Sequence, residues 1–205
     1  MKKAATRIPL PLQFCVLLGV LLLTGCAKAP PPTLYLLDTQ APAQLPGLEQ
    51  GIVVGVGPIE TSRYLDRNQI VTRSDTPKLE AAGRHQWAEP LKAGVSRVLL
   101  VNLGLALDSN RIYELPMRRR RPLDYQVPID VLRFDGVLGR EVILSVRWTL
   151  LSGDGDETLL SRVSRIIEPA AGLSVEAFVA AQSRALAKLA REIADGIQAQ
   201  TDRGQ

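Results

Sequence analysis

Few side chains in this sequence could do covalent chemistry. The two cysteines are Cys15 and Cys26, and His85 is the only histidine. Nucleophilic catalysis needs a nucleophile beside a base, and neither a Gly-x-Ser-x-Gly turn nor a second histidine supplies that pair. A metal site of nitrogen and sulfur ligands is not expected either. There is no second histidine to join His85, and Cys15 and Cys26 belong to a leader and its cleavage site. The residue types therefore predict a protein that is not an enzyme and that needs no cofactor or metal.

Cys26 offers a different chemistry, because it ends the motif Leu23-Thr24-Gly25-Cys26. A thiol behind small residues can be alkylated with diacylglycerol and become the acylated first residue of a mature chain, and the four residues resemble a bacterial lipobox. Three basic residues in positions 2–7 precede the apolar run Phe14–Leu23, as in a signal peptide. The run is shorter than the ~20 apolar residues that span a bilayer. We predict a signal peptide over residues 1–25 and lipidation of Cys26.

Removal of this leader changes the length and the net charge of the chain. It leaves 180 of the 205 residues and lowers the net charge from +4 to +1, so the composition does not indicate a nucleic-acid binder. Both cysteines are then accounted for, and the folded part must be stable without a disulfide. Residues 26–32 end in three prolines and are predicted to form an extended tether that keeps the domain close to the membrane.

The densest charge in the sequence is the run Arg118, Arg119, Arg120 and Arg121, bracketed by Pro116 and Pro122. Guanidinium groups pair well with phosphate and carboxylate groups. The run is therefore a candidate patch for phospholipid headgroups or for an acidic surface on a partner. An ordinary solvated loop remains the alternative.

Hydrophobic periodicity predicts two main helices and a mixed, largely antiparallel sheet, which is an α/β fold. Apolar residues at three- and four-residue spacing predict a helix over 90–107 and a longer one that starts near Ser174 and frays after Gln198. The predicted strands are 33–37, 52–56, 70–72, 78–82, 111–113, 124–134, 141–151 and 158–167, with the last three in a meander.

Several details of these strands can be tested against the structure. The strand over 52–56 is predicted to end at Gly57-Pro58, and Asp135 with Gly136 to begin the turn after the strand over 124–134. In the last strand, alternation places Leu159, Val163 and Ile167 on the inward face.

Two motifs and one shorter stretch carry a resemblance to a known family. Tyr64–Arg73 reads Tyr-Leu-Asp-Arg-x-Gln-Ile-Val-Thr-Arg, Trp87–Leu91 reads Trp-Ala-Glu-Pro-Leu, and Leu34–Leu37 follows soon after the lipobox. These stretches resemble the ABC-type transport auxiliary lipoproteins, also described as PqiC- or YmbA-like. The resemblance covers residues 33–200, essentially the whole mature chain.

The resemblance implies a lipoprotein in the outer membrane, facing the periplasm, with a fold similar to the N-terminal domain of TolB. Its partner would be an MCE-domain protein that carries phospholipids or related molecules between the two membranes, and Ala27 after the cysteine favours outer-membrane sorting. Direct phospholipid contact and homo-oligomerisation stay open. A structural lipoprotein that binds cell wall or an assembly machine is the alternative function.

The motifs supply six candidate interface residues. Tyr64 and Trp87 are amphipathic aromatics suited to interfaces. Four charged residues accompany them, and these could instead pair within the fold: Asp66, Arg67, Arg73 and Glu89. The same residues could equally fix the hairpin against the following helix.

Overall fold

A computed structural model describes residues 30–40, 51–74, 77–117 and 121–204. The chain divides into two compact units, and the second unit begins at Pro32. The larger sheet of this unit has five strands in the order β5-β2-β6-β7-β8. The bounds are β2 Val54–Thr61, β5 Ile112–Glu114, β6 Tyr125–Val137, β7 Glu141–Ser152 and β8 Thr158–Pro169.

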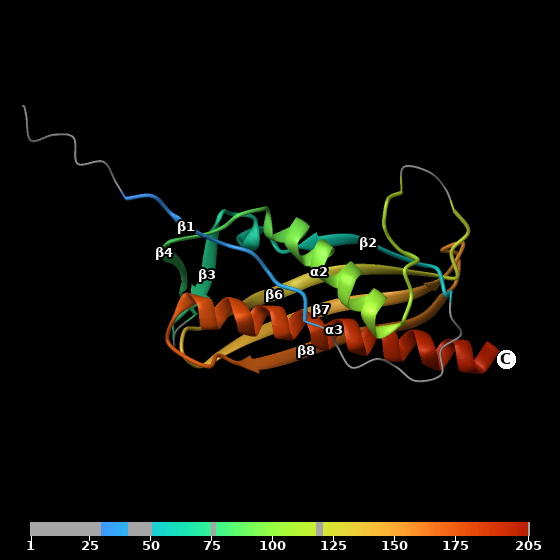
Figure 1. Cartoon of the computed structure of the whole chain (residues 1–205). Helices are drawn as coiled ribbons and strands as arrows, with labels where there is room; N and C mark the ends of the chain where they lie inside the picture. The colour runs from blue at the N-terminus through green and yellow to red at the C-terminus, as the bar shows by residue number, and fades with distance from the viewer. Residues whose placement is uncertain (1–29, 41–50, 75–76, 118–120, 205) are drawn as a thin grey trace, which may run out of the picture. The chain divides into compact units, whose positions relative to one another are not determined.

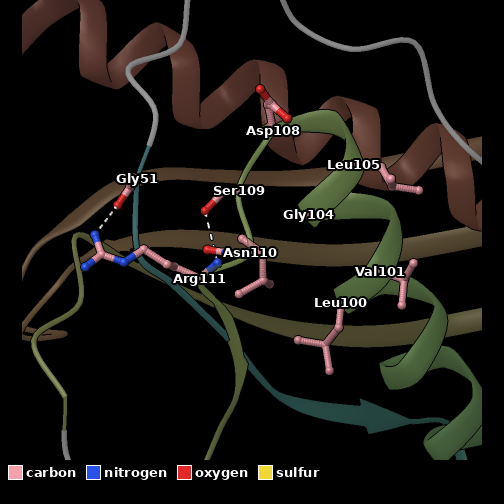
Figure 2. A pocket seen from close by; sticks show the side chains of 10 residues that line it. Gly51, Leu100, Val101, Gly104, Leu105, Asp108, Ser109, Asn110 and Arg111 are labelled. Carbon is pink, nitrogen blue, oxygen red and sulfur yellow. Dashed lines mark hydrogen bonds between the residues drawn. The ribbon is translucent and has the colours of Figure 1, made fainter.

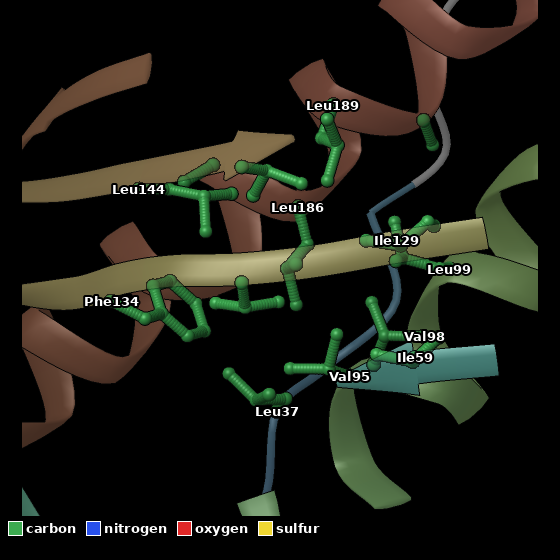
Figure 3. Packing of buried hydrophobic residues seen from close by; sticks show 14 of the residues in the cluster. Leu37, Ile59, Val95, Val98, Leu99, Ile129, Phe134, Leu144, Leu186 and Leu189 are labelled. Carbon is green, nitrogen blue, oxygen red and sulfur yellow. The ribbon is translucent and has the colours of Figure 1, made fainter. Parts of the chain in front are cut away.

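Helices α2 (Leu91–Ala106) and α3 (Val175–Gly204) lie side by side on one face of this sheet (Figure 1). Between them and the sheet lies one apolar core, in which Phe134 of β6, Leu99 of α2 and Leu186 of α3 have no exposed surface (Figure 3). Trp148 of β7 is also fully buried. Burial of these large side chains supplies the main stabilisation of a fold that has no disulfide among its described residues.

The smaller sheet has three strands in the order β1-β4-β3, and it lies at the end of the larger sheet where α3 begins (Figure 1). Its bounds are β1 Thr33–Tyr35, β3 Gln69–Arg73 and β4 Leu79–Trp87, and a short 3-10 helix, η1 (Arg63–Leu65), precedes β3. β3 and β4 form the predicted antiparallel hairpin, whereas β1 pairs with β4 in parallel.

The structure confirms the predicted α/β class with two helices on mixed sheets. Both helices start within one residue of their predicted positions, and Ser174 caps α3 by accepting a hydrogen bond from the amide of Ala177 at 3.2 Å. The meander β6-β7-β8 is antiparallel throughout. The division of the strands into two sheets was not anticipated.

The inward face of β8 was predicted wrongly at two of the three named positions, whereas Leu159 packs against the core as predicted. Val163 and Ile167 are 63% and 43% exposed, and they lie on the sheet face opposite the helices. The register pairs Leu144 with Ile166 and Val146 with Ser164, so Ser164 and Ile166 face the core. A strand with apolar residues on both faces cannot be oriented by alternation alone.

β2 does not end at Gly57-Pro58. The strand continues to Thr61, and its pairing with β6 shifts register between Val56 and Ile59. Gly57 has a φ of 118°, which favours glycine, and the irregularity accommodates a proline that has no amide hydrogen to donate.

α3 does not fray after Gln198 but runs to Gly204. Gln200 Nε2 donates to the carbonyl of Leu159 at 3.3 Å, and the hydroxyls of Tyr125 and Thr201 lie 3.1 Å apart. These side-chain contacts fix the last turns against the sheet, which helical periodicity does not reveal. No helix in the described ranges is long and apolar enough to cross a membrane.

The contact between α3 and β7 gives a test of this packing. A Cβ atom at Gly196 would lie 2.9 Å from Trp148 Cη2 and 3.2 Å from Leu160 Cδ2. We expect Gly196→Val to lower the free energy of unfolding by about 1–3 kcal/mol through overpacking, as measured by urea denaturation. Ala199→Val, at an exposed position of the same helix, is the control. It should lower the free energy of unfolding by only ~0.5 kcal/mol. Equal effects at the two positions would contradict the close approach.

Candidate functional site

Two of the predicted interface residues meet at a buried carboxylate. Tyr64 Oη donates to Asp135 Oδ2 at 2.8 Å, and Arg73 donates to both carboxylate oxygens of Asp135 at 3.0 Å. Arg133 Nε donates to Asp135 Oδ1 at 2.9 Å, and the Tyr64 hydroxyl accepts from the amide of Phe134 at 3.2 Å. We call Tyr64, Arg73, Arg133 and Asp135 the Asp135 cluster. It joins η1, and β3 of the small sheet, to β6 of the large sheet.

The electrostatics of this cluster favour the charged carboxylate. Burial of Asp135 would raise its pKa, but the hydrogen bonds from Arg73 and Tyr64 and the nearby charge of Arg133 outweigh that effect and lower it. Burial, with the hydrogen bond to Asp135, raises the pKa of Tyr64, so this hydroxyl remains a donor. The side chain of Asp135 has no exposed surface. The arrangement is that of a structural ion pair and leaves no group free for proton transfer to a ligand.

Asp135 itself was missed by the sequence analysis, which assigned it to a turn. The structure places it inside β6, opposite Ile143 of β7. Asp-Gly is a typical turn pair, but Gly136 is needed here because a Cβ would lie 2.0 Å from the carbonyl oxygen of Glu141. The only signal in the sequence is an arginine two residues earlier, Arg133, which is on the same face of the strand.

Trp87 and Glu89 also have contacts within the fold. Trp87 is 7% exposed, and its backbone amide donates to the carbonyl of Asn68 at 2.7 Å. Glu89 Oε1 accepts from Arg97 Nη2 at 2.7 Å, and the same nitrogen donates to the carbonyl of Leu37 at 2.8 Å. The second motif therefore connects the segment after β1 to the first turns of α2.

Asp66 and Arg67 differ from the other four motif residues. Both are exposed, and neither side chain has a hydrogen bond or ion pair with another residue in the described ranges. They directly follow η1 in the chain. The structure therefore separates the six candidates into four with internal contacts and two that stay available at the surface.

His85 has a clear structural environment. Its Nδ1 lies 2.8 Å from the hydroxyl of Tyr35, which donates to Glu176 Oε1 at 2.6 Å. Burial and the bond to Glu176 raise the pKa of Tyr35 to about 12. These three residues connect β1, β4 and the first turn of α3. Among the described residues, no three histidine, cysteine, aspartate or glutamate side chains are grouped so that they could bind a metal ion.

The arginine run can be assessed only at its last member. Cys26, Arg118, Arg119 and Arg120 lie outside the described residues. The Arg121 guanidinium carbon lies 5.0 Å from the centre of the Tyr113 ring, and Nη1 donates to the Tyr113 hydroxyl at 3.3 Å. A cation stacked on an aromatic ring keeps a defined position while its charge stays available.

A hollow of about 810 Å³ lies at the C-terminal end of α2 (Figure 2). Leu100, Val101 and Leu105 form its apolar side, and the connection to β5 forms its polar side, where Arg111 Nη1 donates to the carbonyl of Gly51 at 2.9 Å. Val101 and Leu105 are 44% and 40% exposed. The Ser109 hydroxyl on the polar side donates to the carbonyl of Ile52 at 2.8 Å.

Comparisons with known proteins show the family of this chain. The family described as ABC-type transport auxiliary lipoprotein component matches residues 35–194. The chain belongs to this family. The match includes both motifs and the whole Asp135 cluster, so the contacts of the cluster lie within the family domain.

Solved structures show the same fold. A Xanthomonas campestris protein assigned to DUF330 aligns with a TM-score of 0.69 and 19% identity, over 84% of this chain and 99% of that protein. A second crystal structure, of an uncharacterized protein, aligns with a TM-score of 0.67 and 18% identity. The alignment covers 82% of this chain and 99% of that protein. A search of curated proteins found no match.

The Asp135 cluster predicts a specific loss of stability. Asp135→Asn should lower the free energy of unfolding by about 3 kcal/mol at neutral pH, because it leaves Arg73 and Arg133 beside a buried neutral group. Asp130→Asn is the matched control in the same strand. Its carboxylate is 51% exposed and 3.9 Å from Arg147, so the loss should stay below about 1 kcal/mol.

The pH dependence separates a charge effect from a packing effect in the same variant. Because the folded-state pKa of Asp135 is lowered, its contribution is present above the ordinary aspartate pKa of about 3.9 and is lost as the pH falls through the folded value. Urea denaturation between pH 7 and pH 2 should therefore show a smaller acid loss in Asp135→Asn than in the unchanged protein. Parallel curves would contradict a charged Asp135.

Proposed function

We propose that this protein is a non-enzymatic auxiliary component of an MCE- and ABC-type system for intermembrane lipid transport. The family match over residues 35–194 carries the proposal, since that family is defined as a transport auxiliary lipoprotein component. In this proposal residues 1–25 are a signal peptide, 26–32 a lipidated tether, and 33–200 the family domain. Acylated Cys26 anchors the protein in the outer membrane, facing the periplasm.

The internal contacts of the motif residues support a role as a binding module. Tyr64, Arg73, Trp87 and Glu89 are occupied by the fold, so the partner surface is assigned to residues that remain exposed. Asp66 and Arg67 are such residues, and the run Arg118–Arg121 is the candidate for an acidic partner or anionic headgroups. The proposed partner is an MCE-domain protein.

Copurification from crosslinked membranes tests this function. The full-length protein should be recovered together with an MCE-domain protein. A Cys26→Ser variant should fold but stay uncleaved or mislocalised, and it should lose both outer-membrane fractionation and the partner. Recovery with cell-wall material alone would overturn the proposal in favour of a structural lipoprotein, and normal fractionation of Cys26→Ser would remove the assigned anchor.

The arginine run predicts a separate binding defect. Replacing Arg118–Arg121 with serine should weaken binding to liposomes that contain anionic lipid, or to the partner, because about 1 kcal/mol is lost per basic residue near an anionic surface. The control removes the same charge from four other exposed arginines: Arg63, Arg162, Arg165 and Arg203. If both variants bind as well as the unchanged protein at low salt, the run has no binding role.

A further inference from the structure

β5 and the start of β6 lie at the end of the large sheet away from β3 and β4 (Figure 1). An apolar groove of about 830 Å³ is lined by residues between these two strands. Leu115, Pro116 and Met117 form one wall, and Pro122 and Leu123 form the other. We call this the Met117 groove. Its volume and mostly apolar lining match small-molecule sites, which usually measure about 300–1,000 Å³.

The walls of the Met117 groove are fixed by β2. The amide of Leu115 donates to the carbonyl of Val56 at 2.8 Å, and the amide of Asp124 donates to the carbonyl of Val53 at 2.8 Å. The two leucine side chains approach each other over Gly55, where a Cβ atom would lie 2.9 Å from Leu115 Cδ1 and 2.8 Å from Leu123 Cδ1. Because Val54 and Val56 face the helices, Gly55 and the groove lie on the opposite face of the sheet.

Arg121 gives the Met117 groove a positive charge. Its position is set by stacking on Tyr113, and within the described ranges no carboxylate pairs with it. An adjoining hollow of about 660 Å³ shares Pro58, Met117 and Arg121 with the groove. Glu60, Lys92 and Glu114 also line this second hollow, so the guanidinium lies between the apolar groove and a more polar hollow.

The carboxylates around both hollows are already bonded within the protein. Asp154 accepts from the Ser152 hydroxyl and the Asp156 amide, Glu60 lies 3.0 Å from Lys92 Nζ, and Glu114 accepts from the Ser96 hydroxyl at 2.6 Å. Among the described residues, the partner of Arg121 is the neutral phenol of Tyr113. The donors to Asp154 and Glu114 are neutral groups, so these carboxylates are occupied but keep their charge. Arg121 is the group at the groove whose planar donors suit phosphate.

We propose that the Met117 groove binds one phospholipid, with an acyl chain against Met117 and Leu123 and the phosphate at Arg121. Aliphatic walls supply affinity for the chain, and the single guanidinium orients the anionic end. The inference deepens the proposed lipid-transport function and rests on it, since it assigns this protein a direct contact with the transported class of molecule.

Photocrosslinking tests the site without any partner protein. The full-length protein is reconstituted in nanodiscs that contain phosphatidylglycerol with a diazirine on one acyl chain, irradiated and digested with trypsin. Label should concentrate in the peptides 112–118 and 121–133, which carry the groove walls. Arg121→Ala should reduce the label about tenfold, as expected for loss of a hydrogen bond to a charged group. Met117→Asp should remove it.

A matched control comes from the hollow in Figure 2, which has nearly the same volume. Val101→Asp places the same charge there and should leave the labelling unchanged, and the urea midpoint of each variant shows that it is folded. Label in peptide 98–111, or equal label in all peptides, would overturn the site. So would labelling that occurs only when the probe is the corresponding free fatty acid in place of phosphatidylglycerol. Labelling without copurification of a transport partner would instead overturn the function and leave the site intact.

Discussion

The structure depends on how Asp135 is accommodated. A carboxylate with no exposed surface is costly unless its oxygens are bonded, and here the partners come from η1, β3 and β6. Neither sheet alone could provide them. The carboxylate therefore fixes the hairpin β3-β4 on β6, and with the hairpin it fixes Trp87 and the start of α2. The Tyr64–Arg73 motif is thus explained by a residue about 60 positions later in the chain.

Local patterns in the sequence predicted the elements of the fold but not the contacts between them. The stripe on α2, the cap at Ser174 and the meander followed from periodicity and turn chemistry. Asp135, Val163 and Ile167 were misplaced because sheet register and inter-sheet contacts are set by distant residues. The same limit applies to the candidate site, since sequence alone could not separate Tyr64, which is internally bonded, from Asp66, which is not.

The distribution of charge separates the structural parts of the molecule from those available for binding. The buried carboxylates are paired: Asp135 with two arginines, and Glu168 with Arg184 and Lys188. Asp66, Arg67 and Arg121 lack such partners in the described part of the chain. Since an unpaired charge is tolerated only where water or a ligand can reach it, these three residues lie on surfaces that a partner could use, as do exposed arginines such as Arg63 and Arg162.

The segment that begins with β1 shows how a tethered domain can retain its connection to an anchor. β1 has only three residues, too few to resist displacement through sheet pairing alone. The following residues are bonded mainly by side chains of the two helices: Arg97 to the carbonyl of Leu37, Ser183 to the amide of Asp38, and Asn102 to the amide of Gln40. A pull on the tether is therefore opposed by contacts with α2 and α3. In the proposed function, this couples the membrane anchor directly to the core.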